Sequence, residues 1–173
     1  MGFKAVIITV SDKGSRGERE DGSGPEIAGL LQAMGMEIIA RRIIPDEKEM
    51  IRPALIEWSE TDKADLIVTT GGTGVSPRDV TPDATREVIE REIPGMAEAM
   101  RRQSMLVTPH AMISRALVGI RGRTLIINLP GSPKGARENL NVLLPALAHA
   151  IEKIKGDQSE CASRGAAGHA EVK

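Results

Sequence analysis

The chain has 173 residues, about the length of one folded domain. Its 23 basic and 24 acidic residues leave a net charge of −1, and its only aromatic residues are Phe3 and Trp58, so a nucleic-acid partner is not expected. The single cysteine, Cys161, excludes an internal disulfide framework and a multi-cysteine zinc site. The three histidines lack metal-ligand spacing, which disfavours a zinc site made with histidines.

No apolar run reaches the roughly 18 residues that a membrane-spanning helix needs. The first residues run directly into strand-like sequence, without the apolar region of a signal peptide. We therefore expect a cytoplasmic protein that does not associate with membranes.

Apolar, β-branched runs of strand length alternate along the chain with segments of helical periodicity. Strands are predicted at 3–10, 36–44, 65–70, 116–118 and 124–129. Helices are predicted at 25–34, about 47–58, 81–91, from 94 onward, and 140–154, the last either intact or divided at Pro145. The glycine-rich segment 11–24 is predicted to be a loop, and 119–122 a turn.

This alternation predicts an α/β fold with a mostly parallel sheet and helices on both of its faces. The folded domain is expected to span 1–155. The Ala/Gly/Ser-rich segment 156–173 lacks periodicity and is expected to be a mobile tail.

Glycine, serine and charged residues gather directly after the predicted strands. Ser11 and Asp12 follow the first strand, Asp46 follows the second, and two glycine-rich loops at 71–74 and 130–135 follow the third and the last. The carboxyl ends of parallel strands share one edge of a sheet, where open α/β folds bind ligands. We expect these four loops to form one site.

The loops at 71–74 and 131–135 are candidates for binding phosphate, because glycine lets backbone N–H groups approach an anion at a helix start. The other interpretation is a pair of tight turns that bind nothing. Neither loop matches the P-loop pattern, and no dinucleotide-binding fingerprint follows the first strand.

Asp46 and Asp79 are candidates for holding Mg²⁺, which uses one or two carboxylates together with phosphate oxygens. Either could instead cap the helix that follows it. For Asp79 this alternative is weaker, because Thr81 is itself predicted to cap the next helix.

Five arginines and no acidic residue lie between positions 101 and 124. This segregation of charge suits an anionic ligand, and Arg115, beside Ser114, is the arginine expected at the site. The alternative is a solvated helix face and a turn that happen to carry arginines.

Ser132 lies in a turn without a nucleophile-elbow pattern or a histidine partner, so a hydrolase triad is not favoured. Transfer between two phosphorylated substrates needs positioning, a metal and positive charge rather than a protein nucleophile. The residue set suits that kind of reaction.

With these motifs together, the chain resembles the Mog/MoaB-like molybdopterin-binding family over about residues 4–155. The longest signature is Thr69-Thr70-Gly71-Gly72-Thr73-Gly74 followed by Arg78-Asp79-Val80-Thr81-Pro82-Asp83-Ala84-Thr85. Further matches are Val10-Ser11-Asp12, Ser23-Gly24-Pro25, Ile44-Pro45-Asp46-Glu47, Pro94-Gly95 with Glu98 and Arg101, Ser114-Arg115 and Asn128-Leu129-Pro130-Gly131-Ser132-Pro133-Lys134-Gly135.

The resemblance implies a three-layer α/β/α sandwich, a homotrimer and molybdopterin adenylyltransferase activity with ATP and Mg²⁺. It implies that Asp46 and Asp79 are the functional aspartates and magnesium ligands, and that the product passes to a molybdenum-insertion protein. The residues expected to bind the two substrates are Ser11, Asp12, Gly71, Gly72, Thr73, Gly74, Ser114, Arg115, Pro130, Gly131, Ser132, Lys134 and Gly135.

Two other functions are compatible with the resemblance. One is a molybdopterin-binding or chaperone protein without catalysis, which the presence of both aspartates and both glycine loops disfavours. The other is a CinA-like phosphohydrolase, which is disfavoured because that architecture includes a second domain.

Overall fold

The computed structural model describes residues 2–60 and 63–157, so Cys161 and residues 158–173 of the predicted tail lie outside the described residues. Within that range the strands form one six-stranded sheet with the order β2-β1-β3-β6-β5-β4. The strands β2, β1, β3 and β6 are parallel to their neighbours in this series, whereas β5 runs antiparallel to both β6 and β4. The strands are β1 (Lys4–Val10), β2 (Glu37–Ile44), β3 (Leu66–Thr70), β4 (Arg91–Glu92), β5 (Val118–Arg121) and β6 (Thr124–Leu129).

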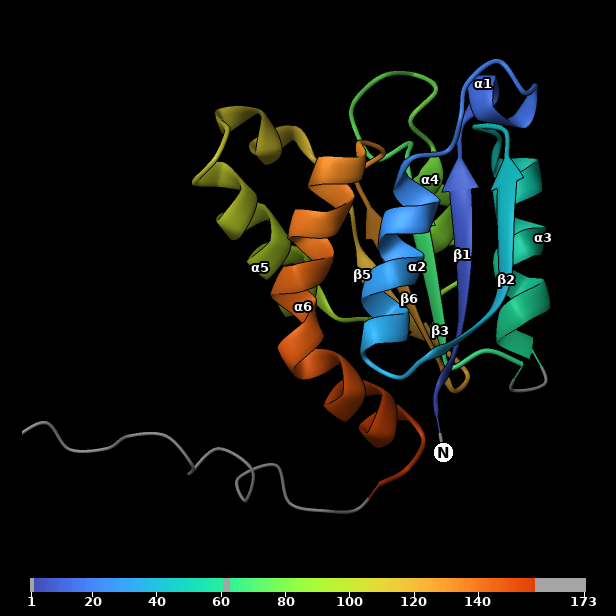
Figure 1. Ribbon diagram of the computed structural model, residues 1–173, viewed down its shortest axis with the longest axis vertical. Helices are drawn as coiled ribbons and strands as arrows, with labels where there is room; N and C mark the ends of the chain where they lie inside the picture. Colours follow the sequence, from blue (N-terminus) through green and yellow to red (C-terminus); the bar gives the residue numbers. More distant parts are fainter. Residues whose placement is uncertain (1, 61–62, 158–173) are drawn as a thin grey trace, which may run out of the picture.

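Helices cover both faces of the sheet (Figure 1). They are α1 (Asp12–Ser15), α2 (Ser23–Ala33), α3 (Lys48–Ser59), α4 (Thr81–Arg86), α5 (Pro94–Met105), the 3₁₀ helix η2 (Pro109–Ile113) and α6 (Pro133–Ile154). Helices α2, α5 and α6 pack on one face, and α3 and α4 pack on the other. The predicted three-layer α/β/α sandwich with a mostly parallel sheet is confirmed.

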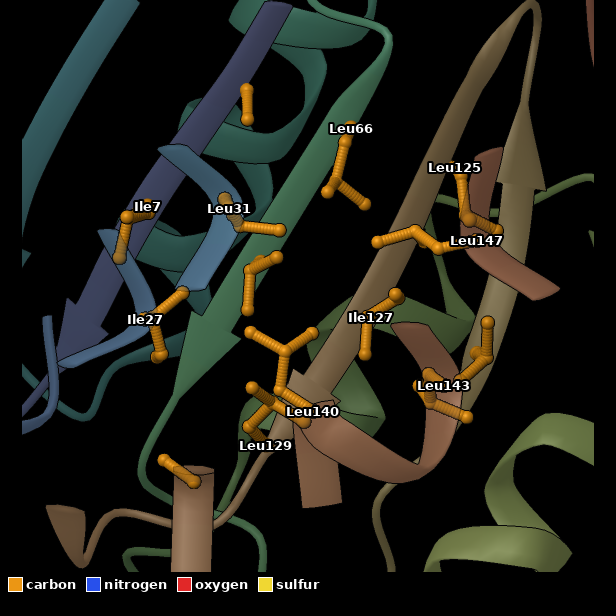
Figure 2. Packing of buried hydrophobic residues seen from close by; sticks show 14 of the residues in the cluster. Ile7, Ile27, Leu31, Leu66, Leu125, Ile127, Leu129, Leu140, Leu143 and Leu147 are labelled. Carbon is orange, nitrogen blue, oxygen red and sulfur yellow. The ribbon is translucent and has the colours of Figure 1, made fainter. Parts of the chain in front are cut away.

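Alternate residues of the central strands belong to two separate cores. On β1, Ala5 and Ile7 lie in the core with α2 and α6, whereas Val6 and Ile8 lie in the core with α3 and α4. Figure 2 shows side chains of α2 and α6 interlocking with those of the central strands in the first of these cores. Because both faces are covered, a central strand is apolar along its whole length, as its sequence indicates.

Two predicted elements, α4 and β5, have other bounds in the structure than the sequence predicts. The helix predicted at 81–91 ends at Arg86, and the short strand β4 follows it. The strand predicted at 116–118 lies instead at Val118–Arg121, so Gly119 is part of a strand and not of a turn. The reason is tertiary: a Cβ at Gly119 would lie 2.5 Å from Ile89 Cδ1, so glycine lets the segment before β4 approach β5 closely.

Two further differences are local. The predicted loop 11–24 contains the one-turn helix α1, because Ser11 Oγ accepts a hydrogen bond from Gly14 N at 3.1 Å and caps it. The last helix is not divided: α6 continues through Pro145 over 22 residues. Across the described residues, no helical segment has the length and hydrophobicity that crossing a bilayer requires.

Candidate functional site

The four loops predicted to converge lie together at the carboxyl edge of the parallel strands, at the top of Figure 1. Hydrogen bonds join neighbouring loops there: Ser11 N donates to Ile44 O at 2.8 Å, and Gly71 N donates to Leu129 O at 3.1 Å. The chain leaves β1 toward β2 on one side, whereas β3 lies on the other side of β1. The site is therefore at the point where the strand order reverses, the usual ligand position in open α/β sheets.

The two glycine loops touch through their backbones. Gly71 has a φ of 104° and Gly72 a φ of 63°, conformations that a side chain would strain. A Cβ at Gly71 would lie 2.2 Å from Val10 O, and one at Gly131 would lie 3.1 Å from the Cα of Gly71. Only glycine permits this approach between the ends of β1, β3 and β6.

Backbone N–H groups of these loops are available to a ligand. Within the described part of the chain, the N–H groups of Gly72, Thr73, Gly74 and Gly131 donate no hydrogen bond. Unpaired N–H groups in a glycine-rich turn form a concavity that suits an anion. This arrangement suits the phosphate-binding role expected of these loops.

Asp46 and Asp12 hold each other through two reciprocal hydrogen bonds. Asp12 N donates to Asp46 Oδ2 at 2.8 Å, and Asp46 N donates to Asp12 Oδ1 at 3.0 Å. Arg78 adds a bidentate bond to Asp12, with Nε to Oδ2 at 3.0 Å and Nη2 to Oδ1 at 2.8 Å. Both carboxylate oxygens of Asp12 are thus engaged within the protein, which suits a positioning role better than the expected substrate contact.

Asp46 does not cap the helix that follows it, because Glu47 occupies that position and no side chain caps α3. Burial raises the pKa of Asp46 above its usual range. The negative charges of Asp12 and Asp79 also raise this pKa, whereas the hydrogen bond from Asp12 N–H lowers it. The bond from Arg78 instead lowers the pKa of Asp12. A bound cation would stabilise the ionised form of Asp46 in this setting.

Asp79 lies in a tight turn beside Gly74. Its Oδ2 accepts a hydrogen bond from Ser76 N at 2.8 Å, and its own N–H donates to Ser76 O at 2.9 Å. A Cβ at Gly74 would lie 2.8 Å from Asp79 Oδ2, so the carboxylate rests against the glycine backbone. Asp79 therefore does not cap α4, and neither does Thr81, which is the first residue of that helix instead of its cap.

Arg115 connects the start of the β5 region to the loop that carries Asp79. Its N–H donates to Thr73 O at 2.8 Å, and its Nε donates to Gly74 O at 2.8 Å. Its guanidinium pairs with Asp83 at 3.1 and 2.8 Å and also donates to the carbonyl of Asp79. The hydrogen bonds from the Arg115 guanidinium lower the pKa of Asp83. These contacts favour a role for Arg115 in bracing this loop over the expected direct contact with an anionic ligand.

Other arginines of the acid-free segment are also engaged by the protein. Arg101 donates to Ala116 O at 2.7 Å, Arg121 donates to Val88 O at 3.0 Å, and Arg123 donates to Lys155 O at 2.8 Å. Much of the local positive charge is thus paired with backbone carbonyl oxygens of the protein itself.

The loop 130–135 begins helix α6. Ser132 caps it by accepting from Gly135 N at 3.1 Å, and Pro130 O accepts from Thr70 Oγ1 at 2.7 Å. Lys134 is exposed and lies 3.9 Å from Glu138 on the same helix. The loop is therefore tied to β3 on one side and presents a helix start on the other.

Two cavities flank the glycine loops and share Ser132 as a lining residue. The polar cavity, about 490 Å³, contains Ser11, Asp46 and the two glycine loops in its wall, together with Arg19 and Asp21. The apolar cavity, about 270 Å³, lies between the glycine loops and helices α5, η2 and α6, and includes Ser114. We name them the polar cavity and the apolar cavity below.

Arg19 is not among the site residues predicted from the sequence, although a basic residue in the glycine-rich loop after the first strand could have indicated it. Arg19 is exposed and forms no hydrogen bond or ion pair with the described residues, in contrast to Arg16, which pairs with Glu18 at 2.8 Å. Thr81, which the sequence indicates only as a helix cap, has a buried hydroxyl beside Gly72, and no local sequence pattern indicates this position.

Comparisons with known proteins agree with this geometry. A family model described as a probable molybdopterin binding domain matches residues 6–149. The chain is 46% identical over 158 residues to gephyrin of Dictyostelium discoideum, covering 86% of this chain but only 22% of gephyrin. It is 40% identical over 153 residues to the molybdopterin adenylyltransferase of Helicobacter pylori strain J99, covering 87% of each.

Among solved structures, the chain is similar to the molybdopterin biosynthesis enzyme MoaB of Thermus thermophilus. The TM-score is 0.85 at 51% sequence identity, covering 90% of this chain and 98% of that one. The similarity thus extends over nearly all of the described residues.

Proposed function

Since the chain belongs to the family of molybdopterin-binding domains, we propose that it is a molybdopterin adenylyltransferase. The terminal phosphate of molybdopterin attacks the α-phosphorus of ATP, a new P–O bond forms, and the bond to the β-phosphate breaks to release pyrophosphate. The observation that carries this proposal is the pair Asp46 and Asp79, held on either side of a glycine loop whose N–H groups are unpaired.

The two cavities support a reaction between two substrates. The polar cavity, with serine, glycine backbone and Arg19, suits phosphate and hydroxyl groups, and the apolar cavity suits a planar heterocycle. Because they meet at Ser132, two ligands in them would have neighbouring ends. Holding two reacting groups in this way supplies a large part of the rate enhancement in phosphoryl-type transfers.

Asp46 and Asp79 fit Mg²⁺ only in the presence of a phosphate ligand. The described residues contain no group of three histidine, cysteine or carboxylate side chains that could hold a metal alone. However, neither Asp46 Oδ1 nor Asp79 Oδ1 accepts a hydrogen bond from a described residue, and Mg²⁺ commonly combines one or two carboxylates with phosphate oxygens. Bound there, the ion would neutralise charge on the phosphates during the transfer.

The assembly and cellular context are part of the same proposal. Exposed apolar side chains on α5, η2 and the segment joining them support a homotrimer that covers them. The protein acts in the cytoplasm and hands adenylylated molybdopterin to a molybdenum-insertion protein.

The direct test is turnover. The purified protein is mixed with molybdopterin, ATP and Mg²⁺, and pyrophosphate and the adenylylated pterin are quantified by mass spectrometry. We expect both products in equal amounts. Binding of molybdopterin without either product would identify a non-catalytic binding protein instead.

A further inference from the structure

The hydroxyl of Thr81 is buried without a hydrogen bond. The residue is fully buried at the amino end of α4, and its Oγ1 has no hydrogen-bond partner among the described residues. A buried hydroxyl in that state costs free energy, so folded proteins retain few of them, and a functional site is one place where they persist.

Three other buried threonines among the described residues have hydroxyls that donate hydrogen bonds. Thr70 Oγ1 donates to Pro130 O at 2.7 Å, Thr85 Oγ1 to Thr81 O at 2.8 Å, and Thr124 Oγ1 to Ala64 O at 2.6 Å. Thr81 also does not use its hydroxyl as a helix cap. The lack of a hydrogen-bond partner thus distinguishes the Thr81 hydroxyl from those of these three threonines.

The Thr81 hydroxyl lies against the candidate active site. Thr81 N donates to Gly72 O at 3.2 Å, which fixes the helix start beneath the glycine loop. A Cβ at Gly72 would lie 2.5 Å from Thr81 Oγ1 and 3.0 Å from Asp46 Oδ1, so both oxygens flank the same side of Gly72. Asp46 Oδ1 is also the carboxylate oxygen that no described residue contacts through a hydrogen bond.

An unpaired donor and an unpaired acceptor therefore lie across one glycine from each other. We propose that Thr81 is a positioning residue for Asp46: when Mg–ATP binds, the Thr81 hydroxyl donates a hydrogen bond to one lone pair of Asp46 Oδ1, leaves the other lone pair for the cation, and holds that carboxylate in one orientation. The absence of a side chain at Gly72 leaves the space in which the two groups meet. This inference rests on the proposed adenylyltransferase function.

The test compares Thr81→Val, which keeps the shape and removes the hydroxyl, with Thr81→Ser, which keeps the hydroxyl. We expect Thr81→Val to fold with an unchanged or higher melting temperature, since it removes a buried unpaired polar group. Its kcat should fall about tenfold or more, the size expected for a bond to a charged group, with little change in the KM for molybdopterin. Thr81→Ser should restore most of the loss.

A binding measurement makes the test independent of turnover. Isothermal titration with the magnesium complex of α,β-methylene-ATP should give a dissociation constant raised about tenfold in Thr81→Val and close to wild type in Thr81→Ser. Thr124→Val is the matched control, because it removes a satisfied buried hydroxyl far from Asp46: its melting temperature should fall while nucleotide affinity stays unchanged.

The outcomes separate the two proposals. Wild-type protein that binds the analogue but forms no pyrophosphate refutes the proposed function, and the titration still decides on Thr81. Equal affinity and turnover in wild type and Thr81→Val, or equal losses in the valine and serine variants, overturn the role of the hydroxyl. Wild-type protein that does not bind the nucleotide analogue overturns both.

Discussion

At the scale of single residues, the two candidate catalytic aspartates are held by different means. Asp46 is partly buried and bonded to Asp12, whereas Asp79 is fixed by a local turn with Ser76. Each has one carboxylate oxygen engaged by a backbone N–H and the other free of bonds from the described residues. The backbone thus orients the carboxylates and leaves a ligand oxygen on each.

Asp79→Asn should abolish turnover without unfolding the protein. The amide keeps the size of the side chain but loses the negative charge that a cation beside phosphate needs. We expect kcat to fall at least about a hundredfold, an order of magnitude typical of electrostatic groups at an active site, while the melting temperature moves by a few degrees. Pyrophosphate release and thermal unfolding measure the two effects, and full activity would remove Asp79 from the site.

Arg19→Ala should weaken the binding of a phosphate-bearing substrate. Arg19 lines the polar cavity and has no protein partner among the described residues, so its guanidinium is free to pair with phosphate. A charge-assisted bond of about 1.5–3 kcal/mol corresponds to a KM raised about ten- to a hundredfold. The matched control is Arg16→Ala, which removes an arginine already paired with Glu18 and should leave KM unchanged. Equal KM values in both variants would refute the assignment.

At the scale of elements, the loop between β3 and α4 is held by bonds from two distant parts of the chain. Arg78 donates hydrogen bonds to Asp12, which follows β1. Arg115, in the segment before β5, donates to Gly74 O and to the carboxylate of Asp83. Both ion pairs are exposed, so they add little to the stability of the fold. Their effect is to restrict the loop that carries Asp79.

Arg115→Ala should lower kcat while changing the melting temperature by only a few degrees. If Arg115 braces the loop through its ion pair, Asp83→Asn should produce a similar fall in kcat, although Asp83 is the partner and not a substrate contact. Measuring kcat and molybdopterin affinity in both variants decides this. A loss of molybdopterin affinity confined to Arg115→Ala would restore the direct substrate contact expected from the sequence.

Pro145 offers a test of how α6 is stabilised. A proline inside a helix removes one backbone hydrogen bond and costs about 3 kcal/mol, offset by up to about 1 kcal/mol because it restricts the unfolded chain. Pro145→Ala should therefore raise the free energy of unfolding by about 2–3 kcal/mol in urea titrations, with unchanged kcat. A decrease in stability would mean that the packing of α6 requires the proline ring.

At the scale of the whole molecule, apolar surface is concentrated at the end of α5 and on η2. Leu106 is 76% exposed, Val107 60% and Met112 65%, and these residues lie close together in the chain. Exposed apolar side chains clustered in this way commonly mark a protein interface. The rest of the described surface carries such residues more sparsely, as with Met50 on α3.

Replacing both Leu106 and Val107 by serine should convert the proposed trimer to monomers, because it removes apolar area that the interface would bury. Light scattering coupled to size-exclusion chromatography measures the mass, with Met50→Ser as the control that should remain trimeric. A monomeric wild type, or a trimeric double variant, would contradict this surface as the trimer contact.

The sequence by itself determined most of the elements and the loops that form the site. The strand at Lys4–Val10 was predictable because a continuous apolar run of strand length indicates burial on both faces. The helix at Lys48–Ser59 was predictable because its apolar periodicity indicates one buried face. The position of Asp46 and the glycine loops at strand ends, and of Asp79 in the loop after β3, followed from the predicted parallel sheet, since parallel strands end at one edge.

Only the tertiary structure decided which of these residues contact each other. The reversed direction of β5 brings Ser114 and Arg115 to the same edge as the end of β6, although they precede their strand. Hydrophobic periodicity indicates that a strand is buried but not the direction in which it pairs. For the same reason the bonds of Asp12 to Asp46 and the burial of the Thr81 hydroxyl were not predictable, because each depends on segments far apart in the chain that meet only after folding.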